Sequence, residues 1–381
     1  MNRRKVLVVA GEPSGDLHAS RLVRALRDKA PDLEVLGVGG PRMREAGTTM
    51  VVSLEHMGVM GFTEVISKLH SFIGLMWKLK KLMKHERPQL LIAVDFPGFN
   101  LRLCRYAKRL GIPVMYYIAP QVWAWGQGRV KFMASNIDRI AVVFPFEVDF
   151  FRGHGLEVEF VGHPLLESVR VEGEKAEVRR RLGLSSELPV VALLPGSRRQ
   201  EVRRLLPSML AAGVKLSEKR SVELAVCAAD GALSSEIKKM IAKLDLPVRV
   251  LEGRSSELLY VSSAAVIASG SATLEAAILG TPMVIVYRVS PLSWAIARRL
   301  VAIDTIGLVN IVAGKKIVSE YLQNDIDPSR ISEELGELVF DEEKRRELIA
   351  SLALVESSLG RPGASQRAAA LALSMLPAVG S

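Results

Sequence analysis

The chain has 381 residues, more than the roughly 250–300 at which one hydrophobic core usually stops growing, so we expect two domains. With 49% hydrophobic and 24% charged residues, its composition excludes a disordered, collagen-like or coiled-coil chain. The two cysteines lie far apart in apolar surroundings, which argues against a disulfide scaffold or a cysteine-based zinc site. The net charge of +10 falls mainly in residues 1–165 and favours anionic partners: phosphates, nucleic acid or an acidic membrane surface.

The sequence begins with a short strand pattern, VLVVAG at 6–11, and lacks the composition of a signal peptide. No uninterrupted apolar run reaches the ~20 residues that are needed to span a bilayer. We therefore expect a cytoplasmic protein.

In residues 1–164, short apolar runs alternate with helical patterns such as 17–29 and 99–110. This alternation predicts βαβ units and a doubly wound parallel sheet. Runs such as VLVVA and LLIAV are apolar throughout, which is typical of strands buried on both faces. The predicted strands are Lys5–Val9, Glu34–Val38, Gln89–Asp95, Val114–Ile118, Arg139–Phe144 and Val158–Val161.

A second alternating series follows a charged segment that we interpret as a hinge near 164–175. We therefore predict an α/β protein with two Rossmann-like domains, 1–164 and 165–357. Ligands of such open sheets bind beyond the carboxyl ends of the strands, so we expect the motifs to face each other across an interdomain cleft. The predicted elements are strands Val190–Leu194, Glu223–Ala228, Val248–Leu251, Ala264–Ala268 and Met283–Tyr287, and helices 200–217, 232–243, 271–279, 291–301 and 328–357.

Two turns of the first domain carry polar groups at predicted strand ends. The run GEPSGD at 11–16 offers backbone N–H groups to an anion, and its alternative is an ordinary βα turn with a polar cap. Asp95 follows strand 90–94 and precedes a Pro-Gly turn, where a carboxylate can act as a general base toward a hydroxyl. Its alternative is to cap helix 99–110 or to pair with an arginine. A Pro/Gly-bounded loop, 120–126, carries Trp123 and Trp125, for which packing is favoured over a wall for an apolar ligand.

Two turns of the second domain are suited to phosphates. In LLPGSRR at 193–199 small residues let the backbone approach a phosphate, and an arginine can bind it with paired donors. In ASGSATLE at 268–275 hydroxyl and N–H groups converge at a helix start, where a diphosphate would sit. Glu275 lies one turn further and suits two ribose hydroxyls. The alternatives are a solvated basic helix face for the first turn and a simple capping arrangement for the second.

The stretch His70–Lys84 has apolar residues on one helical face and lysines over the rest, with Trp77 among them. This composition is typical of a helix in a membrane interface, and its alternative is an amphipathic helix packed on the sheet. The apolar, Gly-rich loop 57–62 is a second candidate lipid contact.

Metal and nucleic-acid sites are not indicated. The histidines are dispersed without ligand spacing, and His163 is interpreted as a hinge or ligand contact. No G-x-x-x-x-G-K-[ST] run is present, which argues against a P-loop NTPase. Only the net charge favours nucleic acid, so we expect no nucleic-acid partner.

Ten motifs together closely resemble the lipid-A-disaccharide synthase family, whose members are GT-B glycosyltransferases. The resemblance spans residues 5 to about 322, and it implies a GT-B fold. By analogy with that fold, a C-terminal helix at about 358–381 packs back on the first domain. The motifs are GEPSGD at 11–16, GPRM at 40–43, MGVMGFTEV at 57–65, VDFPGFN at 94–100, PQVWAW at 120–125, VGHP at 161–164, LLPGSR at 193–198, ASGSATLE at 268–275, YRVSP at 287–291 and LVNIVAG at 308–314.

The resemblance implies an inverting, metal-independent transfer without a cofactor. It joins UDP-2,3-diacylglucosamine to 2,3-diacylglucosamine 1-phosphate and gives a β-1,6-linked disaccharide phosphate and UDP, in lipid A assembly. Asp95 then matches the essential aspartate that deprotonates or orients the acceptor 6-hydroxyl, and Arg198 matches the arginine that offsets charge on departing UDP. The implied UDP-sugar ligands are Gly196, Ser197, Ser269, Gly270, Ser271, Thr273, Glu275 and Asn310.

The same resemblance predicts how the first domain meets the lipid substrates. Because each sugar carries two acyl chains, we expect the enzyme to bind peripherally to the anionic inner leaflet, and a homodimer is plausible for the family. Predicted acceptor or cleft residues are Ser14, Gly15, Asp16, Asn100, Gln121, Trp123 and His163. Predicted membrane or acyl contacts are Val59, Met60, Phe62, Phe72, Leu75, Met76, Trp77 and Leu79.

Three other functions are compatible with parts of the sequence. The first is another GT-B activity on UDP-N-acetylglucosamine, such as a peptidoglycan-type transferase or a UDP-sugar 2-epimerase, which leaves PQVWAW, MGVMGF and VDFPGFN unexplained. The second is a non-catalytic two-lobed binder of anionic ligands, in which Asp95 is dispensable. The third, a basic peripheral scaffold that uses only helix 70–84, leaves the second-domain motifs unexplained.

Overall fold

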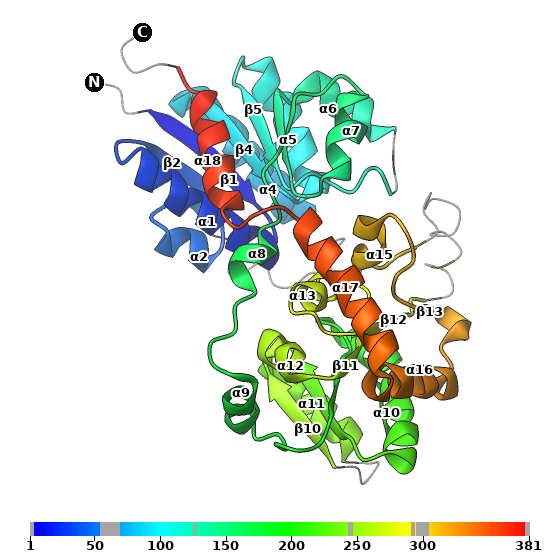
Figure 1. Ribbon diagram of the computed structural model, residues 1–381. Coiled ribbons are helices and arrows are strands. Elements are labelled where there is room, and N and C mark those ends of the chain that lie inside the picture. Colours follow the sequence, from blue (N-terminus) through cyan, green and yellow to red (C-terminus); the bar gives the residue numbers. More distant parts are fainter. Residues whose placement is uncertain are drawn as a thin grey trace. The chain divides into compact units, whose positions relative to one another are not determined.

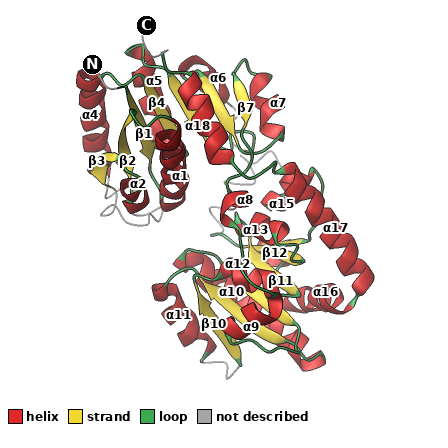
Figure 2. Ribbon diagram, turned by 60° about the vertical axis from the view of Figure 1, so that its left-hand side comes forward, coloured by secondary structure: helices red, strands yellow, loops and turns green. Residues whose placement is uncertain are grey.

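The chain divides into two compact units, which are described separately. Unit 1 comprises Met1–Pro164 with Gly360–Ser381, and unit 2 comprises Leu165–Leu359. A computed structural model describes residues 4–53, 69–124, 126, 128–242, 247–290, 294 and 305–377. In each unit a layer of strands carries helices on both sides (Figures 1 and 2).

Unit 1 is built on a parallel seven-stranded sheet in the order β3-β2-β1-β4-β5-β6-β7. Its central strands are apolar and fully buried, because helices cover both faces and no polar alternation is needed. The carboxyl ends of β1, β4 and β5 therefore meet at one edge of the sheet. The strands are β1 (Lys5–Ala10), β2 (Glu34–Gly39), β3 (Thr49–Ser53), β4 (Leu90–Val94), β5 (Val114–Tyr117), β6 (Arg139–Val142) and β7 (Val158–Phe160).

The helices of unit 1 come from both ends of the chain. The C-terminal helix packs against the first helix (Figure 1), and Arg367 Nε donates a hydrogen bond to the carbonyl of Val161 at 2.9 Å. The last helix is thus part of the unit that the first 164 residues begin. The helices are α1 (Pro13–Lys29), α2 (Pro41–Glu45), α4 (Leu69–Glu86), α5 (Pro97–Arg109), α6 (Arg129–Asn136), α7 (Phe146–Arg152) and α18 (Ala364–Ser374).

Unit 2 has a parallel six-stranded sheet in the order β10-β9-β8-β11-β12-β13. Its strands are β8 (Val190–Leu194), β9 (Glu223–Ala228), β10 (Val248–Glu252), β11 (Ala264–Ala268), β12 (Met283–Tyr287) and β13 (Glu320–Leu322). Its helices are α8 (Leu165–Ser168), α9 (Lys175–Leu182), α10 (Arg199–Lys219), α11 (Gly231–Ile241), α12 (Ser255–Val261), α13 (Ala272–Ile278), α15 (Leu308–Ala313), α16 (Pro328–Phe340) and α17 (Glu342–Ser358), with a 3-10 turn at Gln323–Asp325.

The predicted doubly wound α/β class is confirmed, and every predicted strand is present with ends within two residues. The short edge strands β3 and β13 were not predicted. The single helix expected over 328–357 is wrong: it is interrupted at Asp341, whose carboxylate accepts from the backbone N–H groups of Glu343 and Lys344 and starts α17. The helix expected at 291–301 lies almost entirely outside the described residues.

Candidate active site

Asp95 lies directly after β4, at the carboxyl edge of the unit 1 sheet. It and Phe96 both have left-handed backbones, with φ of 48° and 53°. Two consecutive non-glycine residues in this region cost free energy, and such strain is typical of functional sites. The Asp95 carbonyl accepts hydrogen bonds from Asn100 Nδ2 at 2.8 Å and from the Tyr116 hydroxyl at 2.7 Å. The strained turn is therefore fixed from α5 and from β5.

Asp95 is half-buried at this edge of the sheet. Burial, assisted by the charge of Glu12, raises its pKa to about 6, although a hydrogen bond from the Phe96 backbone opposes the shift. A carboxylate with a pKa near 6 is ionised at neutral pH and is a stronger base than an ordinary aspartate. Asp95 therefore has both the position and the basicity of a general base.

The predicted role of Asn100 as an acceptor contact is wrong. Its side chain is fully buried, and Nδ2 donates to the carbonyls of Val9, Val94 and Asp95. These bonds tie the carboxyl ends of β1 and β4 together, so the amide serves the framework that carries Asp95.

The turn at 11–16 brings together some of the predicted residues. Ser14 is exposed and Gly15 is buried. Asp16 is also buried, and its carboxylate accepts from the backbone N–H groups of Gly40, Arg42 and Met43, at the start of α2. Both oxygens of Asp16 thus stabilise that helix start, and its predicted substrate contact stays a prediction.

Trp123 and Glu147 form a buried polar pair in unit 1. The indole Nε1 of Trp123 donates to Oε1 of Glu147 at 3.0 Å, and Oε2 accepts from the N–H groups of Val143 and Phe144. Burial raises the pKa of Glu147 to about 7 against the pull of these bonds. Glu147 was not among the predicted residues, although FPFEVDFF, an apolar run that carries two carboxylates, was a signal.

Aromatic rings surround this pair. Trp123 packs edge-on against Phe146, which stacks on Phe144, and Phe144 contacts the ring of His163 at 5.1 Å. Trp123 thus packs within the core of unit 1, whereas Gln121 is exposed and Trp125 lies outside the described residues. His163 is buried, and burial lowers its pKa to about 3, so the ring is neutral at physiological pH.

In unit 2, the turn after β8 presents Arg198 at the start of α10. Gly196 has φ of 104°, and a Cβ there would lie 2.5 Å from the Glu201 carboxylate, so the position requires glycine. Arg198 is 64% exposed and pairs with Glu201 at 2.9 Å, whereas Arg199 pairs with Glu236 at 2.8 Å. The two neighbouring arginines therefore point to different partners.

The turn after β11 uses most of its hydroxyl groups internally. Ser269 Oγ donates to the carbonyl of Ile306 at 2.9 Å, and the buried Thr273 Oγ1 donates to that of Gly270 at 2.8 Å. The expectation that Thr273 holds a diphosphate is therefore wrong. Ser271 is exposed at the start of α13.

Glu275 is half-buried one turn into α13. Its Oε1 accepts hydrogen bonds from the hydroxyls of Ser255, at 3.0 Å, and Ser256, both at the start of α12. Within the described part of the chain, Oε2 makes no hydrogen bond to protein. Neither serine was predicted as a site residue, although both orient the carboxylate.

Asn310 has no polar atom left for a nucleotide. It is 1% exposed; Nδ2 donates to Val318 O and to Glu320 Oε1 at 2.7 Å, and Oδ1 accepts from the N–H groups of Ile317 and Val318. The predicted nucleotide contact is therefore wrong. Glu320 also accepts from the N–H groups of Ile306 and Gly307, so the pair holds the segment that Ser269 contacts.

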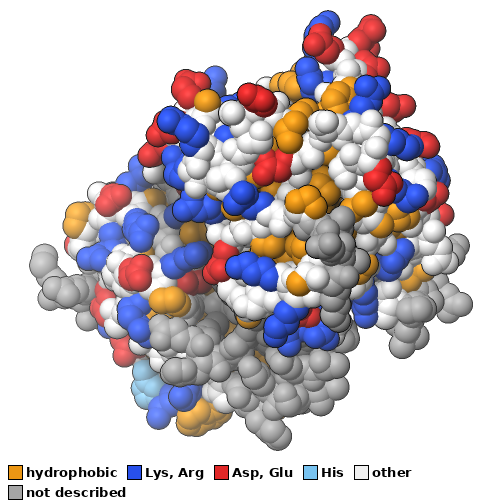
Figure 3. Space-filling model, turned by 90° about the horizontal axis from the view of Figure 1, so that it is seen from below, with side chains coloured by type: hydrophobic (Ala, Val, Ile, Leu, Met, Phe, Trp, Pro, Cys, Tyr) orange, Lys and Arg blue, Asp and Glu red, His pale blue; other side chains and the backbone are white. Residues whose placement is uncertain are grey.

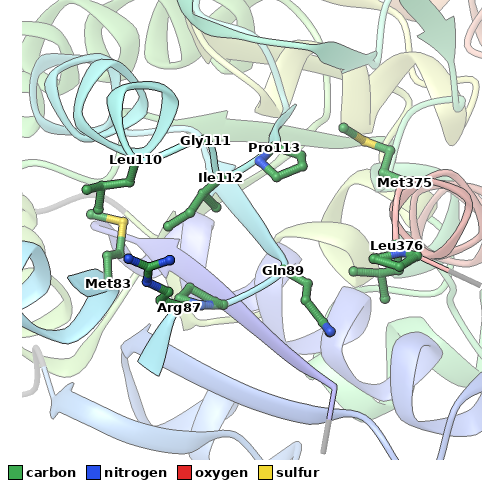
Figure 4. Close-up of a pocket in the computed structure, with 11 residues that line it drawn as sticks. Met83, Arg87, Gln89, Leu110, Gly111, Ile112, Pro113, Met375 and Leu376 are labelled. Carbon is green, nitrogen blue, oxygen red and sulfur yellow. The ribbon is translucent and has the colours of Figure 1, made fainter. Parts of the chain in front are cut away.

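A cavity of about 560 Å³ lies elsewhere in unit 1. Its walls come from the amino ends of β4 and β5 and from the last turns of α4, α5 and α18 (Figure 4). Met83, Leu110, Ile112 and Met375 line it, with Arg87 and Gln89 among them. It is therefore at the sheet edge opposite to Asp95.

Among the described residues, no group of three or more His, Cys, Asp or Glu side chains could hold a metal ion. Basic side chains are interspersed with acidic and apolar ones on the face shown in Figure 3.

The sequence comparisons decide the family. A family model for lipid-A-disaccharide synthetases matches residues 6–374. The chain belongs to this family. The lipid-A-disaccharide synthase of Syntrophus aciditrophicus is 44% identical over 378 residues, which cover 99% of each chain. That of Geobacter sulfurreducens is 41% identical over 373 residues, which cover 98% of this chain and 97% of the relative. The expected glycosyltransferase class is thereby confirmed.

Solved structures agree on the fold. A UDP-N-acetylglucosamine 2-epimerase from Neisseria meningitidis, bound to UDP-N-acetylglucosamine, superposes with a TM-score of 0.68 at 12% identity, covering 97% of this chain and all of the other. The likeness confirms the predicted GT-B fold. At this identity it concerns the fold alone, whereas the sequence relatives belong to the lipid-A-disaccharide synthetase family.

Helix α4 carries several of the predicted membrane contacts, and its burial pattern tests some of them. Leu75, Leu79 and Met83 are buried in the unit 1 core, and Phe72, Met76 and Leu82 pack partly against it. The predicted lipid contacts of Leu75 and Leu79 are therefore wrong, because this face of the helix covers the sheet. Those of Phe72 and Met76, which are only partly buried, stay predictions. Trp77, in contrast, is 65% exposed, and Ile73 is 60% exposed. Val59, Met60 and Phe62 lie outside the described residues.

Among the described residues, no helix combines the length and the apolar character that crossing a bilayer requires.

Proposed function

We propose that the protein joins UDP-2,3-diacylglucosamine to 2,3-diacylglucosamine 1-phosphate and releases UDP. The family match over residues 6–374 carries this proposal. In the reaction, the acceptor 6-hydroxyl attacks the anomeric carbon of the donor with inversion, the bond to UDP breaks, and the hydroxyl proton passes to a base. The product is a β-1,6-linked disaccharide phosphate.

Asp95 is the base in this proposal. Its raised pKa, about 6, and its fixed backbone at the carboxyl edge of β4 support the assignment. A base must be ionised at the working pH yet basic enough to accept a hydroxyl proton, and a pKa near 6 meets both needs. Unit 1 then binds the acceptor, with Ser14, Gly15 and Gln121 as further candidate contacts.

Unit 2 binds the UDP-sugar in this proposal. Arg198, exposed at the start of α10, binds the diphosphate and offsets the charge that develops on departing UDP. Glu201 competes for the same guanidinium, so UDP binding exchanges one anionic partner of Arg198 for another. Backbone N–H groups at Gly196, Ser197, Gly270 and Ser271 supply further donors, and Glu275 Oε2 accepts from the ribose.

Peripheral contact with anionic lipid belongs to the same proposal. Ile73, Trp77, Lys81 and Lys84 are exposed along one side of α4, and Lys81 lies over the Trp77 ring at 5.7 Å. An exposed tryptophan beside lysines suits the boundary between lipid headgroups and water. The contact surface is thus the outer side of α4, and the inner side packs on the sheet.

The experiment is a turnover assay in detergent-dispersed lipid with mass-spectrometric detection. The two diacylated substrates are supplied with EDTA present throughout, and UDP-N-acetylglucosamine serves as the control donor. Disaccharide from the acylated pair alone supports the proposal, its lipid requirement and its metal independence. No product from that pair, together with UDP released from the plain sugar, would favour the 2-epimerase or peptidoglycan-type alternative.

A further inference from the structure

The strained pair Asp95–Phe96 depends on a small set of buried contacts. A Cβ on Gly11 would lie 2.1 Å from the Phe96 ring, so glycine is needed there for Phe96 to occupy its place. The Phe96 ring also stacks on Phe99 at 5.5 Å and lies 5.9 Å from that of Phe72. These contacts fix Phe96, but they do not touch the carbonyl of Asp95.

That carbonyl has two donors from distant elements. Asn100 Nδ2, from the first turn of α5, and Tyr116 Oη, from β5, bind it at 2.8 and 2.7 Å. The Asp95 N–H in turn donates to the carbonyl of Tyr117 at 3.1 Å. With both backbone polar groups held, the direction in which the Asp95 side chain leaves the backbone is set.

Asn100 is a poor choice if its purpose is stability alone. Its Oδ1 is buried and has no hydrogen-bond partner among the described residues, while Nδ2 is shared among three carbonyls. A buried, unsatisfied acceptor costs roughly 1–3 kcal/mol. Asn100 thus leaves a buried polar atom without a hydrogen bond, and it does so beside a strained turn. A protein retains such an unfavourable residue when the turn is needed for function.

We propose that Asn100 is a positioning residue for the transfer reaction: it holds the left-handed turn that aims the Asp95 carboxylate, and Tyr116 assists through the same carbonyl. The inference rests on the proposed function of Asp95. In this proposal one side chain, that of Asp95, is held in position by β5, α5 and the end of β1.

The first experiment compares Asn100→Ala and Tyr116→Phe with the wild type. Asn100→Ala should lower kcat by about 10- to 100-fold, because a misplaced reacting group loses the advantage of orientation. Tyr116→Phe keeps the ring, removes one donor and should lower kcat less. UDP affinity, measured by calorimetry, should stay within twofold in both variants, since the donor site belongs to unit 2.

The matched control is Asn136→Ala. Asn136 is also an amide in unit 1, and its Nδ2 donates to a single carbonyl, that of Phe132, at 2.7 Å. Its removal should leave kcat unchanged. Equal losses for Asn136→Ala and Asn100→Ala would overturn the proposal, because they would mark a general effect of destabilising the unit.

A double-mutant cycle separates positioning from folding. If Asn100 acts only through Asp95, adding Asn100→Ala to Asp95→Asn should not lower the residual rate further. A further loss equal to that of the single variant would contradict the proposal.

A second readout needs no turnover. The groups that face the Asp95 carboxyl are Glu12 from the β1–α1 turn and Tyr116 from β5. If Asn100→Ala releases the turn into water, the pKa of Asp95 should fall from about 6 toward 3.8. The pH dependence of the difference in unfolding free energy between each protein and its Asp95→Asn derivative measures this pKa. If Asn100→Ala changes neither the pKa of Asp95 nor kcat, the positioning role is overturned. If the wild type is inactive but Asn100→Ala still lowers the pKa of Asp95, only the proposed function is contradicted.

Discussion

The indole N–H of Trp123 donates to Oε1 of Glu147 at 3.0 Å, and the other oxygen of the same carboxyl accepts from two backbone N–H groups at the end of β6. Three buried donors thus meet on one buried carboxyl group. The arrangement anchors the loop after β5 to the start of α7. This loop is the one whose two tryptophans are prominent in the sequence.

Removing Glu147 should therefore destabilise unit 1. Glu147→Ala leaves the three donors without an acceptor, and we expect a loss of about 2–4 kcal/mol in unfolding free energy. Urea denaturation measures it. Asp149→Ala, an exposed carboxylate on the same helix, should change stability by less than about 0.5 kcal/mol. A comparable loss in both variants would mean that the buried pair contributes no more to the unfolding free energy than an exposed carboxylate does.

Asp95→Ala should abolish most turnover while UDP still binds. Loss of a positioned base is expected to lower kcat by about 10²-fold or more. Steady-state kinetics and UDP calorimetry test the two halves of this prediction, with Asp32→Asn, an exposed carboxylate paired with Arg4, as the control. Lost UDP affinity in Asp95→Ala would contradict its assignment as the base.

The raised pKa of Asp95 also predicts how pH affects stability. The pKa of Asp95 is about 6 in the folded protein and about 3.8 when unfolded, so ionising this carboxyl group lowers the unfolding free energy. The protein therefore keeps its full stability at low pH and loses part of it as pH rises through 6. The difference between these two pKa values corresponds to about 3 kcal/mol. Asp95→Asn should therefore stabilise the protein by up to that amount at pH 8, and by only about 0.5 kcal/mol at pH 4. Unfolding curves at the two pH values test this sign, and equal differences at both would refute it.

The two adjacent arginines of α10 should behave differently toward UDP. Arg198→Ala should weaken UDP binding about 10- to 100-fold and lower turnover, as expected for a lost charged hydrogen bond to phosphate. Arg199→Ala should have little effect, because its side chain pairs with Glu236. Calorimetric titration with UDP compares the two, and the reverse order of effects would assign the phosphate to Arg199.

Membrane affinity should depend on the outer side of α4. Trp77→Ala and the pair Lys81→Gln with Lys84→Gln should each weaken binding to anionic vesicles, the lysines by about 1 kcal/mol apiece at low salt. Leu354→Ala, which removes a 73% exposed apolar side chain from unit 2, is the control for Trp77→Ala. Vesicle sedimentation at low and high salt measures the effect. Unchanged sedimentation of the Trp77 and lysine variants would exclude α4 as the contact surface.

Much of the architecture was predictable because it depends on local pattern. Runs such as VLVVA and LLIAV predicted buried parallel strands, and their order with the intervening helices predicted two open sheets. Placing Asp95 at a strand end also needed only the sequence, since the end of the apolar run at Val94 is visible in it.

The partners of the polar side chains required the tertiary structure. Asp16 binds backbone 24 residues away, Trp123 binds Glu147 across the same separation, and Asn310 is fully satisfied by residues 317–320. A motif that contains the right residue types for a ligand can equally hold its own fold together, and sequence spacing does not distinguish the two.

The sequence by itself therefore determined the family, the α/β class and the strand ends at which the chemistry is placed, because hydrophobic periodicity and motif order are properties of the chain. Only the tertiary structure decided which candidates keep an available polar group. It also decided which side of α4 is buried, since periodicity predicts an apolar face but not what covers it. Covering that face with the sheet leaves Ile73 and Trp77 outside, where the helical pattern alone did not separate them from the lysines.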